Sequence, residues 1–188
     1  MTVLAHIAAS LIGVTYSEVV GKHRRLPIHL IKESDMSVKP IPEGYHRITP
    51  YLGINEAAEA IEFYKTAFGA QQIMRLDMPD GRVGHAELRI GDSAFMLGSP
   101  CEESALHSPN NGHTSVGLHL YVEDVDAQYQ KAIDAGAKII SRPSDQFYGD
   151  RSGTLRDPFG HVWFVATQKE SLSEDQIKQR AKALFQQS

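Results

Sequence analysis

Residues 52–69 read LGINEAAEAIEFYKTAFG, the pattern of a strand end that runs into a capped helix. Asn55 can cap a helix over residues 56–68, because its side-chain oxygen can accept from the first free backbone N–H groups. Gly69 can end that helix in the left-handed conformation that favours glycine. The apolar side chains recur at helical spacing, which predicts one buried stripe made of Ala57, Ile61, Tyr64 and Phe68.

The same order returns in residues 120–136, which read LYVEDVDAQYQKAIDAG and begin 68 residues after Leu52. Asp124 takes the place of the cap and Gly136 that of the helix stop. The pattern around each helix predicts four strands, at residues 48–54, 71–77, 85–90 and 93–97 in the first copy and at residues 117–122, 138–141, 153–156 and 161–166 in the second. A repeat of this period predicts an α+β fold of two βαβββ modules that fold together, at about residues 45–98 and 117–168.

Three further segments lie outside the two modules. Residues 1–44 form an N-terminal extension and linker, and Met36 could be the natural start, since the domain pattern begins just after it. Residues 99–116 are a polar, turn-rich link whose length suits a lid or an exchange arm. Residues 169–188 contain a helix over 172–186, and its capping box can be made by Ser171 with Glu174 or by Ser173 with Gln176.

The composition is that of an ordinary globular protein, with 41% hydrophobic and 22% charged residues. The formal net charge of −4 gives no electrostatic reason to bind nucleic acid or an anionic membrane. No run approaches the roughly 18 apolar residues of a transmembrane helix, so we expect no membrane partner. The single cysteine, Cys101, excludes an internal disulfide and fits a cytoplasmic location.

Three motifs carry a resemblance to a known family, namely Phe63-Tyr-Lys-Thr-Ala-Phe-Gly69, His85-Ala-Glu-Leu-Arg-Ile-Gly-Asp92 and Asp157-Pro-Phe-Gly160. From Tyr45 to Gln168 the chain resembles the vicinal-oxygen-chelate superfamily of glyoxalase I, extradiol dioxygenases and bleomycin-resistance proteins. The run from Gln146 to Trp163 is similar to the PhnB-like branch of that family. The resemblance implies the glyoxalase/bleomycin-resistance fold, in which both modules form a half-open mixed sheet around a cavity, and it implies a homodimer.

Strand alternation sorts the side chains into one face that packs under the helices and one face that lines the cavity. On the helix face we expect the apolar set Ala86, Leu88, Ile90, Phe95 and Leu97. We expect the ligand-contacting side chains of the cavity face to be Thr49, Tyr51, His85, Glu87, Arg89, Met96, His119, Tyr121 and, through the family register, Phe164. Tyr148 and Arg151 join them from a loop, where Arg151 could pair with Asp150 or bind an anionic ligand.

The metal-dependent members of the family draw their ligands, usually two histidines and two glutamates, from the first and last strands of each module. Through the family landmarks, these places fall here on Thr49, Met96, Gly117 and Phe164. None of the four is a good ligand for a divalent ion, which prefers imidazole nitrogen or carboxylate oxygen. The standard glyoxalase metal ligands are therefore absent.

A displaced metal site is an alternative. His85 and Glu87 share one strand face, and His119 lies on a first strand. Together they could hold a divalent ion such as Zn²⁺, Ni²⁺, Fe²⁺ or Mn²⁺ with open positions for substrate. Otherwise the same groups line a polar pocket or bond to one another and to Arg89. A further histidine, His161, we expect at an exposed sheet edge.

Three functions follow from these observations. The first is a small-molecule-binding protein with an aromatic and polar cavity, in which Tyr51, Tyr121 and Phe164 can either stack on a flat ligand or fill the core. The second is a metal-dependent lyase, isomerase or dioxygenase, whose ion would polarise neighbouring substrate oxygens. The third is a dimeric interaction protein without a ligand. The sequence leaves open whether the protein is an enzyme and which molecule fills the cavity.

Overall fold

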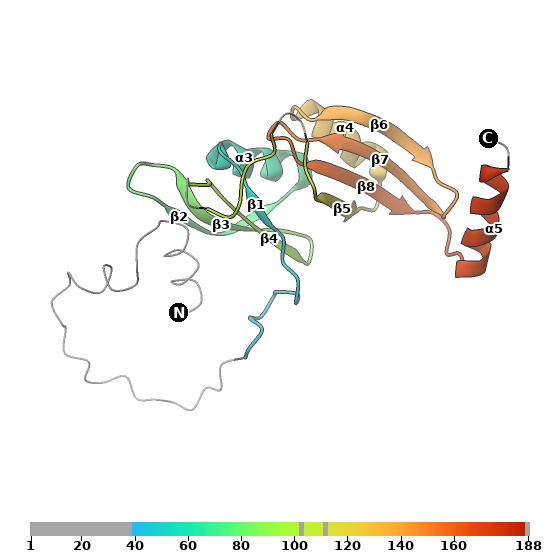
Figure 1. Cartoon of the computed structure of the whole chain (residues 1–188), viewed down its shortest axis with the longest axis horizontal. Helices are drawn as coiled ribbons and strands as arrows, with labels where there is room; N and C mark the ends of the chain where they lie inside the picture. The colour runs from blue at the N-terminus through green and yellow to red at the C-terminus, as the bar shows by residue number, and fades with distance from the viewer. Residues whose placement is uncertain (1–38, 102–103, 111–112, 187–188) are drawn as a thin grey trace. The chain divides into compact units, whose positions relative to one another are not determined.

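A computed structural model describes residues 39–101, 104–110 and 113–186 (Figure 1). Most of the predicted N-terminal extension, including Met36, lies outside the described residues. The chain forms two compact units. The first holds the residues up to Ala58 together with Gln71–His107, and the second holds Glu59–Ala70 together with the residues from Ser108 on. Each unit contains one four-stranded sheet, and the βαβββ order occurs twice, so the predicted repeat and the α+β class are confirmed.

The sheet of the first unit has the strand order β1-β4-β3-β2. Strand β1 is parallel to β4, whereas β3 is antiparallel to both β4 and β2. The predicted alternation of the hairpin is confirmed, because Leu88 pairs with Phe95 and Glu87, on the other face, pairs with Met96. The strands are β1 (Tyr51–Gly53), β2 (Gln71–Asp77), β3 (Val83–Ile90) and β4 (Ser93–Gly98).

Strand β1 is shorter than the predicted residues 48–54. Pro50 has no backbone N–H to donate to a ladder. Its carbonyl oxygen still accepts a hydrogen bond from the N–H of Met96 on β4, at 2.8 Å. Residues 39–50, here called the N-terminal strap, contain no helix or strand and lead into β1 (blue in Figure 1). The strap therefore meets the sheet through side chains and carbonyls rather than through a ladder.

The sheet of the second unit has the order β5-β8-β7-β6, which repeats the order of the first sheet. Helix α4 (Val125–Asp134) lies against β6, β7 and β8, and Asp124 caps it by accepting from the N–H of Ala127 at 3.1 Å. The strands are β5 (Gly117–Tyr121), β6 (Lys138–Asp145), β7 (Asp150–Arg156) and β8 (Val162–Gln168). Strands β6 and β7 are both longer than predicted, because the pairing of Ser144 with Ser152 continues the ladder. The sequence does not show this extension, since Pro143 and the polar residues around it hide the alternation of β6.

Helix α3 (Ala57–Phe68) belongs to the second unit from Glu59 on. Its anchor there is the buried carboxylate of Asp157, which accepts from the hydroxyl of Tyr64 at 2.8 Å and from the indole N–H of Trp163 at 3.0 Å. The ring of Phe68 lies 4.4 Å from that of Trp163, measured between centroids. The helix of the first repeat copy is thus fixed to the last hairpin of the second copy.

The turn that carries Asp157 also closes on this carboxylate. The backbone N–H groups of Phe159 and His161 donate to it at 3.0 and 2.9 Å. His161 is only 7% exposed, so the expectation of an exposed sheet edge is wrong. The turn draws the backbone of His161 inward, because a buried carboxylate needs every donor that it can collect.

Helix α5 (Glu174–Phe185) confirms the predicted C-terminal helix, and its capping box uses Ser173 and Gln176 rather than the alternative pair. The helix has no buried residue. The guanidinium of Arg180 donates to the carboxylate of Glu170 at 2.7 and 3.1 Å, which ties the helix to the segment before it. Among the helices of the described residues, none combines the length and the apolar character needed to cross a bilayer.

Replacing Asp157 by Ala should lower the free energy of unfolding by about 2–6 kcal/mol, because the buried hydroxyl of Tyr64 and the indole N–H of Trp163 lose their acceptor. Urea denaturation measures this difference. The matched control is Asp134→Ala, since Asp134 is an exposed carboxylate at the end of α4. A loss no larger than that of the control would show that Asp157 does not anchor α3.

Candidate functional site

Four side chains of the first unit form a continuous row of hydrogen bonds, here called the polar row. The hydroxyl of Tyr45 donates to Oε2 of Glu87. Oε1 of Glu87 lies 3.3 Å from Nε2 of His85, and Nδ1 of His85 lies 2.8 Å from the hydroxyl of Tyr51. A carboxylate only accepts, so the network assigns the ring proton of neutral His85 to Nε2 and lets Nδ1 accept from Tyr51.

The strands of the first sheet place this row. His85 and Glu87 are two residues apart on β3, so both point to the same face. Tyr51 reaches His85 from β1 across β4, and Gly98 of β4 makes room for it. A side chain at Gly98 would begin 3.2 Å from the hydroxyl of Tyr51 and 2.7 Å from the carbonyl oxygen of Gly84. The close approach therefore requires glycine at this position.

The interior of the row is shielded from water, because His85 is 3% and Glu87 is 7% exposed. Burial, and after it the charge and hydrogen bond of Glu87, raise the pKa of Tyr45 to about 12. Burial, with Glu87 as the smaller cause, likewise raises the pKa of Tyr51 to about 12. At neutral pH both phenols therefore remain proton donors to the row.

Met96 and Arg89 share this face, as the sequence predicts. Met96 is the ladder partner of both Tyr51 and Glu87, so it lies between these two members of the row. Arg89 donates from Nη2 to the carbonyl oxygen of Gly44 at 3.2 Å, and its buried Nε has no acceptor among the described residues. The face thus offers an apolar centre between fixed donors and acceptors.

Three of the other predicted residues, His119, Tyr121 and Phe164, form an aromatic face in the second unit. The ring of His119 lies 4.6 Å from that of Tyr121 and 6.2 Å from that of Phe164, measured between centroids. Tyr121 and Phe164 are 63% and 41% exposed. The hydroxyl of Tyr121 donates to Oδ2 of the buried Asp150 at 3.0 Å, and Asp150 raises the pKa of Tyr121 chiefly through this bond.

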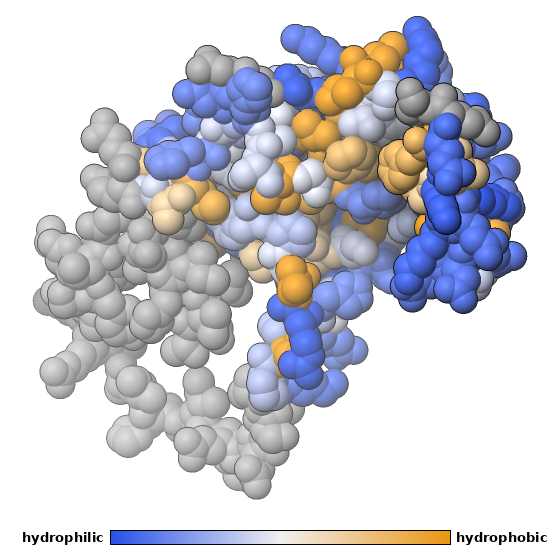
Figure 2. Space-filling view, turned by 45° about the vertical axis from the view of Figure 1, so that its right-hand side comes forward, coloured by the Kyte–Doolittle hydropathy of each residue, from blue (hydrophilic) through white to orange (hydrophobic). Residues whose placement is uncertain are grey.

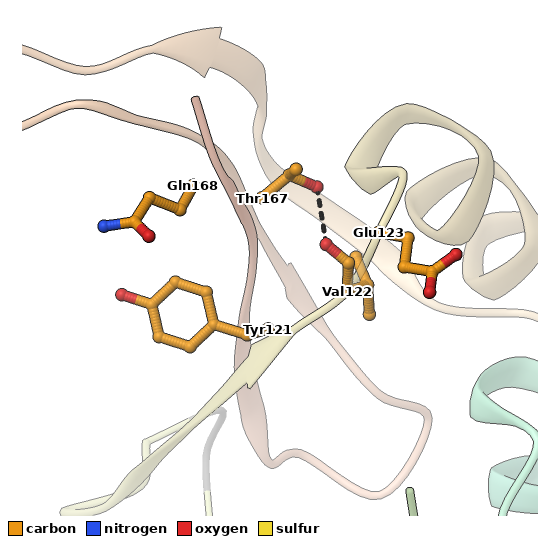
Figure 3. A pocket seen from close by; sticks show the side chains of 5 residues that line it. All are labelled: Tyr121, Val122, Glu123, Thr167 and Gln168. Atoms are coloured by element: carbon orange, nitrogen blue, oxygen red, sulfur yellow. Dashed lines mark hydrogen bonds between the residues drawn. The ribbon is translucent and has the colours of Figure 1, made fainter. Parts of the chain in front are cut away.

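An open hollow of about 720 Å³ lies at the carboxyl ends of the parallel strands β5 and β8. Figure 3 shows the ring of Tyr121 and the side chain of Gln168 on one side of these strands and the carboxylate of Glu123 on the other. Between them the hydroxyl of Thr167 donates to the carbonyl oxygen of Val122 at 2.8 Å. The hollow borders the aromatic face, with which it shares Tyr121.

Tyr148 and Arg151, which the sequence predicts as further ligand contacts, have their hydrogen-bond partners outside the aromatic face. The hydroxyl of Tyr148 lies 3.2 Å from that of Ser152. Arg151 is part of β7, one residue after Asp150, so the two side chains point to opposite faces and, of the two alternatives for Arg151, the pair with Asp150 is wrong. The guanidinium of Arg151 instead donates to both oxygens of Asp126 on α4, at 2.7 and 2.8 Å, and to Asp145.

The metal places inferred from the sequence do not fit a divalent ion. A side chain at Gly117 would meet the ring of Phe164 at 2.5 Å, so an aromatic ring fills the space in which a ligand would begin. Thr49 lies in the strap, where its hydroxyl donates to the carbonyl oxygen of His46 at 3.4 Å. The fourth place, Met96, offers only a thioether, which is a poor ligand for these ions.

The displaced set of ligands is divided between the units. His85 and Glu87 belong to the first unit, whereas His119 belongs to the second, where its ring packs beside Tyr121. Within the part of the chain that the structure describes, no three His, Cys, Asp or Glu side chains gather in a geometry that could hold a metal ion. The metal assignment to these residues stays a prediction.

The sequence analysis did not predict two residues of the site, Tyr45 and Gly98. Tyr45 precedes the predicted first strand, in a segment without periodicity, and its partner Glu87 is 42 residues away. Gly98 ends a strand, where a glycine has several ordinary explanations. A tyrosine directly after Gly44 at the entry to a domain is the sole signal of the contact that the sequence offers.

Comparisons with known proteins agree with this fold. Residues 44–165 match the family model of the Glyoxalase/Bleomycin resistance protein/Dioxygenase superfamily. An uncharacterized protein of Mycobacterium bovis is 38% identical over 135 residues, which cover 70% of this chain and 89% of that relative.

Solved structures show the same fold. TioX from Micromonospora sp. ML1 matches with a TM-score of 0.52 at 26% identity, covering 68% of this chain and 100% of that chain. The PhnB protein from Bacillus cereus matches with a TM-score of 0.51 at 18% identity, covering 65% of this chain and 99% of that chain. The second likeness concerns the fold alone.

Replacing Glu87 by Gln should lower the pKa of Tyr45 from about 12, because the negative charge that opposes a phenolate is lost. The pKa should stay above the ordinary 10.0, because burial is the larger cause and remains. Spectrophotometric titration of the phenolate band measures the shift, and Tyr45→Phe identifies which part of the curve belongs to Tyr45. Identical curves for the unchanged and Glu87→Gln proteins would show that the two residues are not in contact.

The same shift predicts how stability depends on pH. The folded-state pKa of Tyr45 lies above the ordinary value, so its contribution is complete below pH 10.0 and is lost as the pH rises toward about 12. Denaturant unfolding across this range should therefore show a steeper loss of stability in the unchanged protein than in Tyr45→Phe. Parallel losses would contradict the buried contact.

Proposed function

The chain belongs to the Glyoxalase/Bleomycin resistance protein/Dioxygenase superfamily, and on that premise we propose that it is a small-molecule-binding protein. The ligand contacts the face of the first sheet that carries the polar row. The observation that supports this proposal is the burial of His85 and Glu87 on a sheet face opposite the apolar one. Burying polar groups on this face costs free energy of desolvation that apolar side chains would avoid. Fixed donors and acceptors beside the apolar side chain of Met96 can hold a ligand in one orientation.

The aromatic face of the second unit supports the same function. Tyr121 and Phe164 keep much of their ring surface exposed, although aromatic side chains gain from burial. Exposed rings beside an open hollow can stack on a flat molecule. The predicted residues Tyr121, His119 and Phe164 therefore serve as a second contact surface for ligands in this proposal.

A metal-dependent lyase, isomerase or dioxygenase is the second candidate, and the contact between His85 and Glu87 favours it. The same contact equally suits binding without a metal, because Tyr45 and Tyr51 already complete the hydrogen bonds of both side chains. The four carried-over ligand places, moreover, hold no imidazole or carboxylate. We therefore propose binding rather than turnover.

A homodimer is the partner that we propose alongside the ligand. Hydrophobic side chains, orange in Figure 2, stand at the surface between hydrophilic ones. Among the described residues the exposed large hydrophobic side chains include Ile73, Leu76, Ile139, Ile140, Leu184 and Phe185. Such side chains support association where they gather into a contiguous patch, whereas scattered ones are ordinary, and sedimentation analysis of the purified protein measures whether the chains associate. A dimeric interaction protein without a ligand, the third candidate from the sequence, would share these surfaces.

A small molecule found by a broad thermal-shift screen should bind about 10- to 100-fold more weakly after Glu87→Gln, because a hydrogen bond to a charged, buried group is lost. Titration calorimetry measures the affinity. The matched control is Glu62→Gln, since Glu62 is an exposed carboxylate of α3 that pairs with Lys65. Equal affinity in both variants would place the ligand elsewhere, and a screen without any hit would contradict the proposed function.

Incubation with Zn²⁺, Ni²⁺, Fe²⁺ or Mn²⁺ should leave well below one ion per chain after dialysis, because the family's ligand places hold Thr49, Met96, Gly117 and Phe164. Plasma mass spectrometry measures the metal content. Retention near one ion per chain that disappears in His119→Ala would favour the metal-dependent enzyme over the binding protein.

A further inference from the structure

The N-terminal strap sends two consecutive residues to the polar face of β3. The hydroxyl of Tyr45 donates to Glu87, and the carbonyl oxygen of Gly44 accepts from Nη2 of Arg89 at 3.2 Å. Glu87 and Arg89 are two residues apart on the same strand face. A phenol and the peptide carbonyl before it are thus recognised by a carboxylate and a guanidinium side by side.

The approach of the strap is shaped for this contact. Gly44 has a φ of +81°, a conformation that favours glycine, and a Cβ there would lie 2.5 Å from Nη2 of Arg89. The N–H of Tyr45 donates to the carbonyl oxygen of Pro42 at 3.2 Å, which closes a turn directly before the contact. Glycine and turn together bring the carbonyl of residue 44 and the ring of residue 45 to the sheet at once.

We propose that Gly44 and Tyr45 occupy in cis a binding site for compounds that carry a phenolic hydroxyl and a carbonyl oxygen, with Glu87 and Arg89 as the anchors. The inference rests on the proposed function, since it names the ligand class for the same face. Glu87 selects a hydroxyl donor, because a carboxylate only accepts. Arg89 selects an oxygen acceptor, because a guanidinium only donates.

The strap can leave without opening the core. None of the residues 39–50 is buried, whereas Leu52 and Ile54, which follow, are. Tyr45 and Gly44 are held to β3 by the two side-chain contacts described. A segment tethered this closely competes with a free ligand as if it were present at an effective concentration on the order of millimolar. The unchanged protein should therefore bind such a ligand more weakly than a protein whose site is vacant.

The test removes the side chain of Tyr45 and adds a free compound that carries the same phenol and carbonyl groups. N-acetyl-L-tyrosinamide carries an acetyl carbonyl in the place of the Gly44 carbonyl and a phenol in the place of the Tyr45 side chain. Ligand-observed NMR titration should give at least about tenfold tighter binding to Tyr45→Ala than to the unchanged protein. N-acetyl-L-phenylalaninamide, which lacks the hydroxyl, should show no such gain. The matched control is His46→Ala, which removes the neighbouring exposed side chain of the strap and leaves the contacts of Gly44 and Tyr45 in place.

Two further variants test whether Glu87 is the acceptor and provide a second measurement if Tyr45→Ala does not fold. The gain should disappear in the double variant Tyr45→Ala/Glu87→Gln, because the hydroxyl loses its charged acceptor. Circular dichroism shows whether each variant folds. If Tyr45→Ala does not fold, Tyr45→Phe keeps the ring and removes only the hydroxyl, and binding of the tyrosinamide should still tighten relative to the unchanged protein.

Equal affinity of N-acetyl-L-tyrosinamide for the unchanged and Tyr45→Ala proteins would overturn the inference. So would the absence of binding to a folded Tyr45→Ala protein that binds another molecule through Glu87, and in that case the proposed function stands. Absence of binding by any compound, to either protein, would overturn both.

Discussion

The fold depends on one buried carboxylate that collects four donors. Asp157 accepts from Tyr64, from Trp163 and from two backbone N–H groups of its own turn, so its charge is compensated without a cation. In a low-dielectric interior such bonds strengthen one another, and the loss of one partner leaves the others exposed to the full cost of desolvation. Through Tyr64 this carboxylate places α3, a helix of the first repeat copy, within the second unit. The two copies of the repeat are therefore not two independent folds.

The two sheets carry different kinds of side chain on the faces described above. Since α3 belongs to the second unit from Glu59 on, the first unit consists of a sheet and its connecting segments, and one face of that sheet carries hydrogen-bonding groups. The face of the second sheet carries rings. The first unit thus offers fixed donors and acceptors and the second offers ring surface, and both kinds of group occur in small-molecule sites. The charged groups on these faces have neutral partners: Glu87 accepts from Tyr45, Asp150 accepts from Tyr121, and Arg89 donates to a backbone carbonyl oxygen.

How far the sequence predicts this structure differs from residue to residue. The repeat and the faces of β3 follow from periodicity, because a shift of one residue would exchange Leu88 for Glu87 in the core. The face of Arg151 was not predicted, because the sequence pattern begins this strand at residue 153 and leaves Arg151 in a loop, whereas β7 begins at Asp150. The contact of Tyr45 was not predicted for another reason. Its contact joins an aperiodic segment to a strand far along the chain, and no local pattern encodes such a pairing.

The close fit of Gly117 and Phe164 also limits the routes by which this fold could change its chemistry. A histidine or glutamate at position 117 would be needed to rebuild the family's metal centre, yet its first carbon would meet the ring of residue 164 at 2.5 Å. The ring must move or be replaced by a smaller side chain first, so the order of substitutions matters. A mutational path toward a metalloenzyme would therefore be epistatic at its first step, and libraries that vary position 117 alone would miss it.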